Sequence, residues 1–157
     1  RRIFTVTGSG VNQPGNYNVK IGTSYAELVE ASGGLKDGVK KVISGGPMMG
    51  MALSTIDVPV VKTSSALTCF MEDEVEKYEE SACIRCGKCA QVCPSHVIPQ
   101  KLMEAAQHYD MERFTALNGM ECCECGCCTF ICPAKRPLTQ AFKQMRQAVA
   151  AERRKKK

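Results

Sequence analysis

Two runs of cysteines with the same spacing are the part of this sequence that could do chemistry. The residues are Cys83, Cys86, Cys89 and Cys93-Pro94 in the first run, and Cys122, Cys125, Cys128 and Cys132-Pro133 in the second. Each run follows the pattern C-x2-C-x2-C-x3-C-P, the ligand pattern of 4Fe-4S clusters in two-cluster ferredoxins. The spacing therefore predicts two such clusters, whose chemistry is the transfer of single electrons.

The fourth cysteine of each run is expected to serve the other run's cluster, as it does in two-cluster proteins with this pattern. The first cluster would then be held by Cys83, Cys86, Cys89 and Cys132. The second would be held by Cys122, Cys125, Cys128 and Cys93. We therefore expect the two distant segments to be tied together and the clusters to lie close to each other.

Zinc is the main alternative for paired C-x2-C motifs. Structural zinc sites usually take four ligands from two separated C-x2-C pairs, whereas each run here offers four cysteines by itself. A disulfide framework is disfavoured because the cysteines number 11 and because the chain opens with Arg1-Arg2-Ile3-Phe4 and not with an apolar signal segment. Iron-sulfur sites need reduced thiolates, so we expect a reducing cytoplasm or the cytoplasmic side of a membrane.

Three further cysteines, Cys69, Cys123 and Cys127, fall outside the ligand pattern. A register shifted to include Cys123 would break the two-residue spacing. We expect all three to be spare thiols or small buried hydrophobic residues, and the other interpretation is a redox or alternative-ligand role.

The formal net charge of the chain is +5. An oxidised 4Fe-4S core with four thiolates carries about −2, so two clusters would leave about +1. The charge therefore gives no reason to expect nucleic acid as a partner. No apolar stretch approaches about 18 residues, so no transmembrane segment is predicted.

The composition divides the chain into segments, because all cysteines lie at or beyond Cys69. We predict an α+β protein in four parts: a β-rich domain over 1–66, an acidic, helical connector over 67–80, a mainly helical domain over 81–150, and a basic tail over 151–157. Strands are predicted at 3–7, 17–21, 39–44 and 58–62, helices are predicted to open at Ser24, Pro99 and Pro137, and a further short helix is predicted over 111–117. The tail is interpreted as a solvated helix end or as a contact with anionic lipid or an acidic partner.

Several motifs together resemble the C-terminal part of RnfC, a component of the Rnf electron transport complex. Val6-Thr7-Gly8, Gln13-Pro14-Gly15 and Gly22-Thr23 resemble the opening of a soluble-ligand-binding β-grasp (SLBB) domain. The segments 45–50 (GGPMMG) and 57–62 (DVPVVK) resemble the stretch that follows in the RnfC family, and the cysteine runs complete the order. The cysteine runs alone are shared by many ferredoxins, so the combination is the specific signal.

The resemblance implies a β-grasp SLBB domain followed by a mainly α-helical ferredoxin domain with two 4Fe-4S clusters. It implies an electron relay in a membrane-associated complex that exchanges electrons between ferredoxin and NAD while moving sodium ions or protons. The expected partners are the other subunits and ferredoxin, and the expected location is the cytoplasmic side of the membrane, as a peripheral protein. In that family, FMN and NAD bind a domain upstream of the β-grasp unit, so this chain is expected to be an electron-transfer module without catalytic residues of its own.

Two other functions stay open at this point. A cobalamin reductase of bacterial microcompartments resembles the same layout of a β-grasp domain before a two-cluster ferredoxin domain. The chain could also be a structural adaptor, in which metal only stabilises the fold and no electrons pass.

Overall fold

The computed structural model describes residues 1–155. The chain forms two compact units, and the division along the sequence falls between Lys77 and Tyr78. The last two residues of the predicted basic tail, Lys156 and Lys157, lie outside the described residues. Among residues 1–155, no helix is long and apolar enough to cross a membrane.

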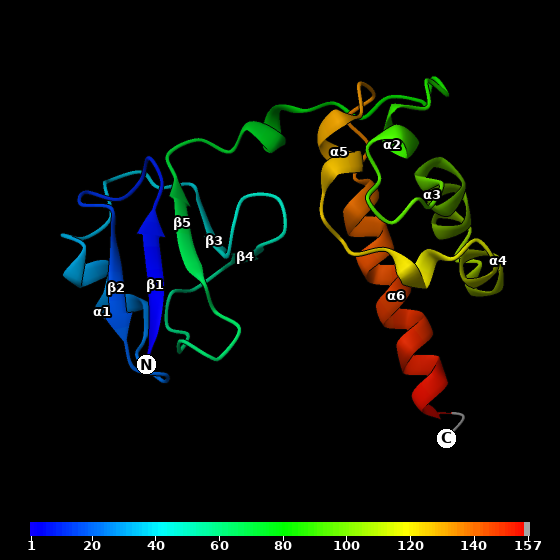
Figure 1. The fold of residues 1–157 in the computed structure, drawn as a ribbon. Coiled ribbons are helices and arrows are strands. Elements are labelled where there is room, and N and C mark those ends of the chain that lie inside the picture. Colours follow the sequence, from blue (N-terminus) through cyan, green and yellow to red (C-terminus); the bar gives the residue numbers. More distant parts are fainter. Residues whose placement is uncertain (156–157) are drawn as a thin grey trace. The chain divides into compact units, whose positions relative to one another are not determined.

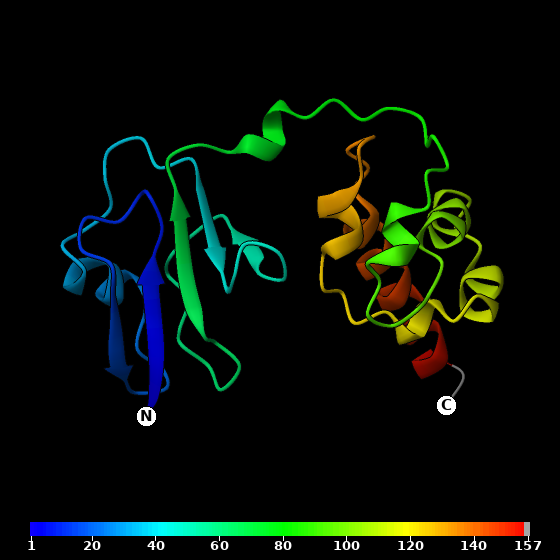
Figure 2. The same ribbon diagram turned by 45° about the horizontal axis from the view of Figure 1, so that its top comes forward.

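The first unit is a five-stranded mixed sheet with one helix (Figures 1 and 2). Its strands are β1 (Arg2–Thr7), β2 (Gly15–Val19), β3 (Lys41–Ser44), β4 (Met51–Leu53) and β5 (Ala66–Phe70). They lie in the order β2-β1-β5-β3-β4, where β1 and β5 are parallel and the other pairs antiparallel. This order, with one helix packed on the sheet, confirms the predicted β-grasp fold.

The helix α1 (Tyr25–Ala31) begins where the sequence predicts it. The Ser24 side chain accepts a hydrogen bond from the Ala26 amide, and the Glu27 carboxylate accepts one from the Ser24 amide. This capping box satisfies two amides that the first helical turn leaves unpaired. Tyr25 and Leu28 are buried against the sheet, and the centroids of the Tyr25 and Phe4 rings lie 5.2 Å apart.

The predicted limit of the first domain at residue 66 is too early, because β5 is the central strand of the sheet. Leu67 and Cys69 on this strand are fully buried in the core. Cys69 is thus buried like a small hydrophobic residue, which agrees with the expectation that it is not a cluster ligand. The predicted strand at 58–62 forms only one bridge, from Pro59 to Ser24.

The acidic segment after β5 is also less regular than predicted. It contains only a short 3-10 helix, Glu74–Lys77. Asp73 forms an ion pair of 2.8 Å with Lys41 of β3, so the beginning of this segment belongs to the first unit.

The second unit, over its described residues, consists of five α-helices around one core (Figure 1). They are α2 (Lys88–Gln91), α3 (Pro99–Gln107), α4 (Met111–Ala116), α5 (Cys127–Ile131) and α6 (Leu138–Lys155). The helix α6 packs on α3, α4 and α5 through its buried residues Leu138, Phe142, Met145 and Val149. These four lie on the apolar stripe that the sequence predicts, spaced three and four residues apart.

The second unit is built from two copies of one backbone pattern. Each residue of the first cysteine run has its counterpart 39 residues later, and α2 and α3 correspond in the same way to α5 and α6. The left-handed backbone positions are repeated as well: Arg85, Gly87 and His96 in the first copy, and Glu124, Gly126 and Lys135 in the second. The sequence repeat of the cysteines is therefore a repeat of three-dimensional structure.

Residues from 78 onward belong to the second unit, which begins earlier than the predicted residue 81. The Ser81 amide donates to the Ala134 carbonyl at 3.0 Å, and Arg136 donates to Glu80 at 3.1 Å. Lys135 lies over the Tyr78 ring, 4.2 Å from its centroid. These contacts hold the end of the connector against the turn that follows Cys132.

Candidate metal centres

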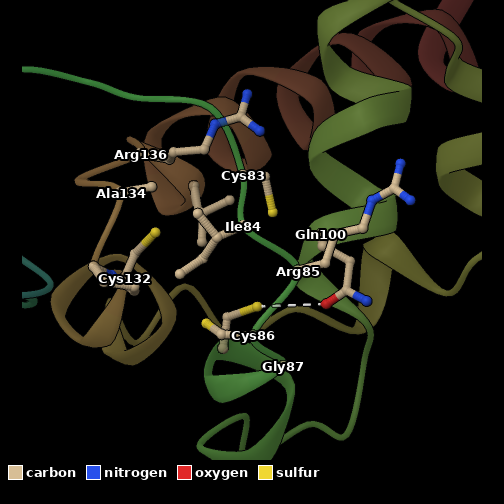
Figure 3. Close-up of a pocket in the computed structure, with 12 residues that line it drawn as sticks. Cys83, Ile84, Arg85, Cys86, Gly87, Gln100, Cys132, Ala134 and Arg136 are labelled. Atoms are coloured by element: carbon tan, nitrogen blue, oxygen red, sulfur yellow. Dashed lines mark hydrogen bonds between the residues drawn. The ribbon is translucent and has the colours of Figure 1, made fainter.

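A first pocket gathers four of the predicted ligand cysteines. Cys83, Cys86 and Cys89 line it together with Cys132, and its open volume is about 420 Å³. Figure 3 shows the side chains of Cys83 and Cys86 on the segment that enters α2, and that of Cys132 on the segment that leaves α5. Three cysteines of the first run thus share a pocket with the fourth cysteine of the second run.

A second pocket gathers the other four. Cys122, Cys125 and Cys128 line it together with Cys93, and its open volume is about 300 Å³. The two pockets therefore divide the eight cysteines in the crossed arrangement that the sequence predicts. The contact between α2 and α5, each of which follows the second cysteine of its run, brings the two runs together.

The local backbone explains how three cysteines of one run reach the same pocket. Gly87 and Gly126 follow the second cysteine of each run with φ of 78° and 85°, and a helix begins at the next residue. Glycine adopts this left-handed conformation at little cost. A Cβ at Gly87 would meet only open space, so the conformation and not crowding favours glycine there. The turn places the cysteines before and after it on the same side of the chain.

The two pockets differ in exposure. Cys83 and Cys86 of the first pocket are exposed, whereas no ligand cysteine of the second pocket is. Cys128 is the most enclosed, with 8% of its surface exposed. The first pocket is therefore the one that water reaches more easily.

Burial raises the pKa of four of the predicted ligand thiols. Removal from water raises the pKa of Cys89, Cys122 and Cys128, and it raises the pKa of Cys125 to about 11. Backbone amides oppose the effect, and the Glu124 amide lies 3.4 Å from the Cys122 sulfur. Thiols of this kind bind as thiolates only when a cation compensates for burial, and a bound metal supplies that charge.

An arginine on α6 adds positive charge near the second pocket. The Arg146 guanidinium forms an ion pair with Glu124 and lowers the pKa of the Cys122 thiol against the effect of burial. Its Nε is buried and has no hydrogen-bond partner among the described residues. An unpaired donor beside a cluster of thiols fits a site that receives a negatively charged group.

The donor set and its geometry fit an iron-sulfur cluster. All eight predicted ligands are cysteines, and neither pocket is lined by histidine. A single zinc ion with Zn–S bonds of about 2.3 Å would draw its sulfurs into close contact. Each pocket is lined by four of these cysteines, drawn from both runs, and an all-cysteine set of four is the usual ligand set of a 4Fe-4S cluster.

The two cysteines of the second run that fall outside the ligand pattern lie beside the second pocket. Cys123 lines this pocket and hydrogen-bonds Ser95 and Cys125, and the Ser95 contact lowers the pKa of its thiol. Cys127 hydrogen-bonds Cys125. In the first run, Ile84 and Lys88 occupy the matching positions. The second pocket thus has a fifth thiol at its edge, and the first does not.

Two polar residues at the pockets were not among the predicted site residues. Gln100 lies 3.7 Å from the Cys89 sulfur and Thr139 lies 3.6 Å from the Cys128 sulfur. Polar residues at the start of a helix are common, so neither is conspicuous by itself. Their equal spacing from the two cysteine runs is the signal that could have found them.

Comparisons with known proteins agree with the fold and with the interpretation of the first cysteine run. Residues 3–52 match the SLBB domain, and residues 76–98, which contain the first cysteine run, match the 4Fe-4S binding domain. The fold and the site thus define an iron-sulfur protein in which an SLBB domain precedes a ferredoxin-like domain.

Two relatives specify the resemblance further, and both are named as the C component of a ferredoxin:NAD(+) oxidoreductase complex. The chain is 37% identical over 155 residues to that of the Na(+)-translocating complex of Acetobacterium woodii, covering 99% of this chain and 35% of that protein. It is 41% identical over 102 residues to that of the proton-translocating complex of Clostridium ljungdahlii, covering 65% of this chain and 22% of that protein. These similarities confirm the predicted resemblance to RnfC, and the chain spans about a third of the length of these relatives or less.

Proposed function

We propose that the second unit binds two 4Fe-4S clusters and relays single electrons through them. Cys83, Cys86, Cys89 and Cys132 hold the first cluster, and Cys122, Cys125, Cys128 and Cys93 hold the second. The observation that carries this proposal is the crossed grouping of the eight cysteines around two pockets. When bound, such clusters supply the capacity to take up and release one electron each.

The residues of the chain position and insulate the relay. The glycine turns set the ligand spacing, and the crossed fourth ligands keep the two sites adjacent. The core around Phe114 and Phe142 limits the access of water from the helical side. A fixed, poorly hydrated surrounding reduces the reorganisation that accompanies each charge change.

We further propose that this relay operates in a complex of the Rnf type. The relatives are named as subunits of ferredoxin:NAD(+) oxidoreductases, and 37% identity extends over 99% of this chain. The other subunits and ferredoxin are the proposed partners, and the chain is placed on the cytoplasmic side of the membrane as a peripheral part. The names of these relatives favour this proposal over a cobalamin reductase.

A nicotinamide exchanges two electrons as a hydride, whereas each cluster carries one. A flavin must therefore separate the pair before or after the relay. We assign the FMN and NAD sites to a domain outside this chain. The β-grasp unit is proposed to orient the relay towards its partners.

Anaerobic analysis of iron and sulfide, combined with absorption and electron paramagnetic resonance (EPR) spectroscopy, tests the proposal. Two clusters require eight irons and eight sulfides per chain, together with absorbance that bleaches reversibly on reduction and a paramagnetic signal of the reduced state. Zinc in place of iron would refute the cluster proposal. Iron without reversible reduction would support the structural adaptor.

The assignment to an Rnf-type complex has a separate test. The full-length protein should co-purify with membranes and with other redox subunits when the membranes are isolated gently. Its recovery in a microcompartment fraction would instead support the cobalamin reductase.

A further inference from the structure

Two side chains at matching positions of the internal repeat contact matching cysteine sulfurs. Gln100 is the second residue of α3 and its Oε1 lies 3.7 Å from the sulfur of Cys89. Thr139 is the second residue of α6 and its Oγ1 lies 3.6 Å from the sulfur of Cys128. Cys89 and Cys128 are the third cysteines of their runs. Each pocket thus has one polar side chain next to one ligand.

The direction of the Thr139 contact follows from the chemistry of its partners. A metal-bound thiolate has no proton, so it accepts a hydrogen bond and the Thr139 hydroxyl must donate it. The Thr139 oxygen then accepts from the Thr129 hydroxyl at 2.9 Å. The Thr129 oxygen in turn accepts from the Thr139 backbone amide, also at 2.9 Å. The two threonines form a chain of hydrogen bonds that points towards the sulfur.

Gln100 can make the same contact with its amide group. Towards a thiol, its oxygen accepts; towards a thiolate, its NH2 group must face the sulfur and donate. A half turn of the terminal amide exchanges the two atoms without moving the rest of the side chain. Gln100 is half-buried, whereas Thr139 is buried with 8% of its surface exposed.

We propose that Gln100 and Thr139 are positioning residues that raise the reduction potential of the cluster in their own pocket. This inference rests on the proposed function. Reduction adds one electron to the cluster and its thiolates, and the protons of the two side chains stay where they are. A donor to a ligand sulfur stabilises the added negative charge, and such hydrogen bonds are among the factors that set cluster potentials.

The two residues act with unequal strength. The Thr139 hydroxyl is on a buried residue and is hydrogen-bonded to Thr129, whereas Gln100 is only half-buried. A hydrogen bond acts more strongly in a less polarisable, enclosed surrounding. Removing the Thr139 hydroxyl therefore shifts a potential further than removing the Gln100 amide.

An anaerobic redox titration of the whole chain, followed by EPR of the reduced clusters, tests the inference. Thr139→Val keeps the shape of the side chain and removes the donor. We expect it to lower one of the two midpoint potentials and to leave the other unchanged. Thr139→Ser keeps a hydroxyl and is expected to restore the potential. Gln100→Leu should lower the other midpoint by a smaller amount, and the double variant should lower both.

The outcomes separate this inference from the proposal on which it rests. Full iron content with both midpoints unchanged in Thr139→Val and Gln100→Leu overturns the inference and leaves the relay intact. An equal shift of both midpoints in either variant also overturns it, because a general structural change would act on both clusters. If Thr139→Val does not load with iron, the Gln100→Leu titration decides by the same criterion. Wild-type protein without iron overturns the proposed function itself.

Discussion

The fourth cysteine of each run is the residue on which the crossed arrangement depends. Cys132 follows α5 in the second run, yet it lines the pocket of the first. We predict that Cys132→Ser disturbs the cluster held by Cys83, Cys86 and Cys89 more than the nearer one, because that cluster loses its fourth thiolate. EPR spectra of the reduced variant measure which of the two signals is lost.

Cys93→Ser provides the matched control for this prediction. It should disturb the other signal, that of the cluster held by Cys122, Cys125 and Cys128. If each variant damages the cluster of its own run, the ligands are not exchanged.

Cys123 is predicted to be a spare thiol, although it lines the second pocket. Its counterpart in the first run is Ile84. We therefore expect Cys123→Ile to keep the full content of iron and both EPR signals, whereas Cys122→Ser should lose one of them. Iron and sulfide analysis of the anaerobically purified variants provides the measurement. Loss of iron in Cys123→Ile would assign a ligand role to Cys123.

The sequence predicted the eight pocket cysteines but not the polar residues beside them. The reason lies in how specific each signal is. Cysteines at fixed intervals before a proline have few other uses, whereas Gln100 and Thr139 could equally serve as ordinary polar residues at a helix start. Arg146 was missed because it belongs to a helix whose basic residues suggest only a solvated face.

A buried aromatic pair packs the helix α6 against the core of the second unit. Phe142 and Phe114 are fully buried, with ring centroids 6.3 Å apart. We predict that Phe142→Ala lowers the stability of the second unit by about 3–5 kcal/mol, through lost burial and the cavity that remains. Urea unfolding under anaerobic conditions, followed by the helical circular dichroism signal, measures the change.

Phe130 on α5 is the control for Phe142, because it is 76% exposed. Phe130→Ala should change the stability by no more than about 0.5 kcal/mol. Equal losses in the two variants would contradict the packing described for α6.

The turn after β1 depends on a glycine. Gly8 has a φ of +110°, and a Cβ there would lie 2.1 Å from the carbonyl oxygen of Cys69 on β5. We predict that Gly8→Ala destabilises the first unit by at least about 1–3 kcal/mol, since both strain and a backbone clash oppose it. Hydrogen exchange of the β1 and β5 amides in the full chain measures the loss of stability.

Gly46→Ala is the matched control for this glycine, because its added Cβ meets nothing within 4 Å. It should leave the exchange of β1 and β5 unchanged. A loss of similar size in both variants would mean that alanine lowers stability here for a reason other than the contact with Cys69.

The elements that the sequence predicted correctly carry strong local signals. The capping box marks the start of α1, and Pro99 stands at the first position of α3. The central strand β5 was missed because only five residues, Ala66–Phe70, separate a polar stretch from an acidic one. Its parallel pairing with β1 is a long-range contact, and a local pattern does not report such contacts.

The whole molecule combines one unit without any of the predicted ligand cysteines with one that contains all of them. All eight predicted ligands lie in the second unit, and the first has its own sheet and core. We predict that chelation of the metal under anaerobic conditions leaves the amide exchange of β1 and β5 unchanged. The segments 83–93 and 122–135 should exchange faster, because their irregular backbone loses the ligand bonds that hold it.

Hydrogen exchange followed by mass spectrometry, with and without bound metal, measures this difference segment by segment. Faster exchange in β1 or β5 after chelation would show that the first unit depends on the second. The contrast between the units was predicted from composition, since no cysteine precedes Cys69. The division between the units, after Lys77, lies within the predicted connector, and the acidic stretch divides its contacts between both units.

The interlocked halves of the second unit also set the time at which a cluster can be completed in the cell. Under the crossed assignment, neither pocket has its full ligand set until the second cysteine run has been synthesised, and the first pocket waits for Cys132. Before Cys132 has been synthesised, the first pocket can offer only three of its four thiolates to incoming iron and sulfide. Neither cluster can therefore be completed before both cysteine runs are present, and by then the β-grasp unit, which precedes both runs, has already been synthesised.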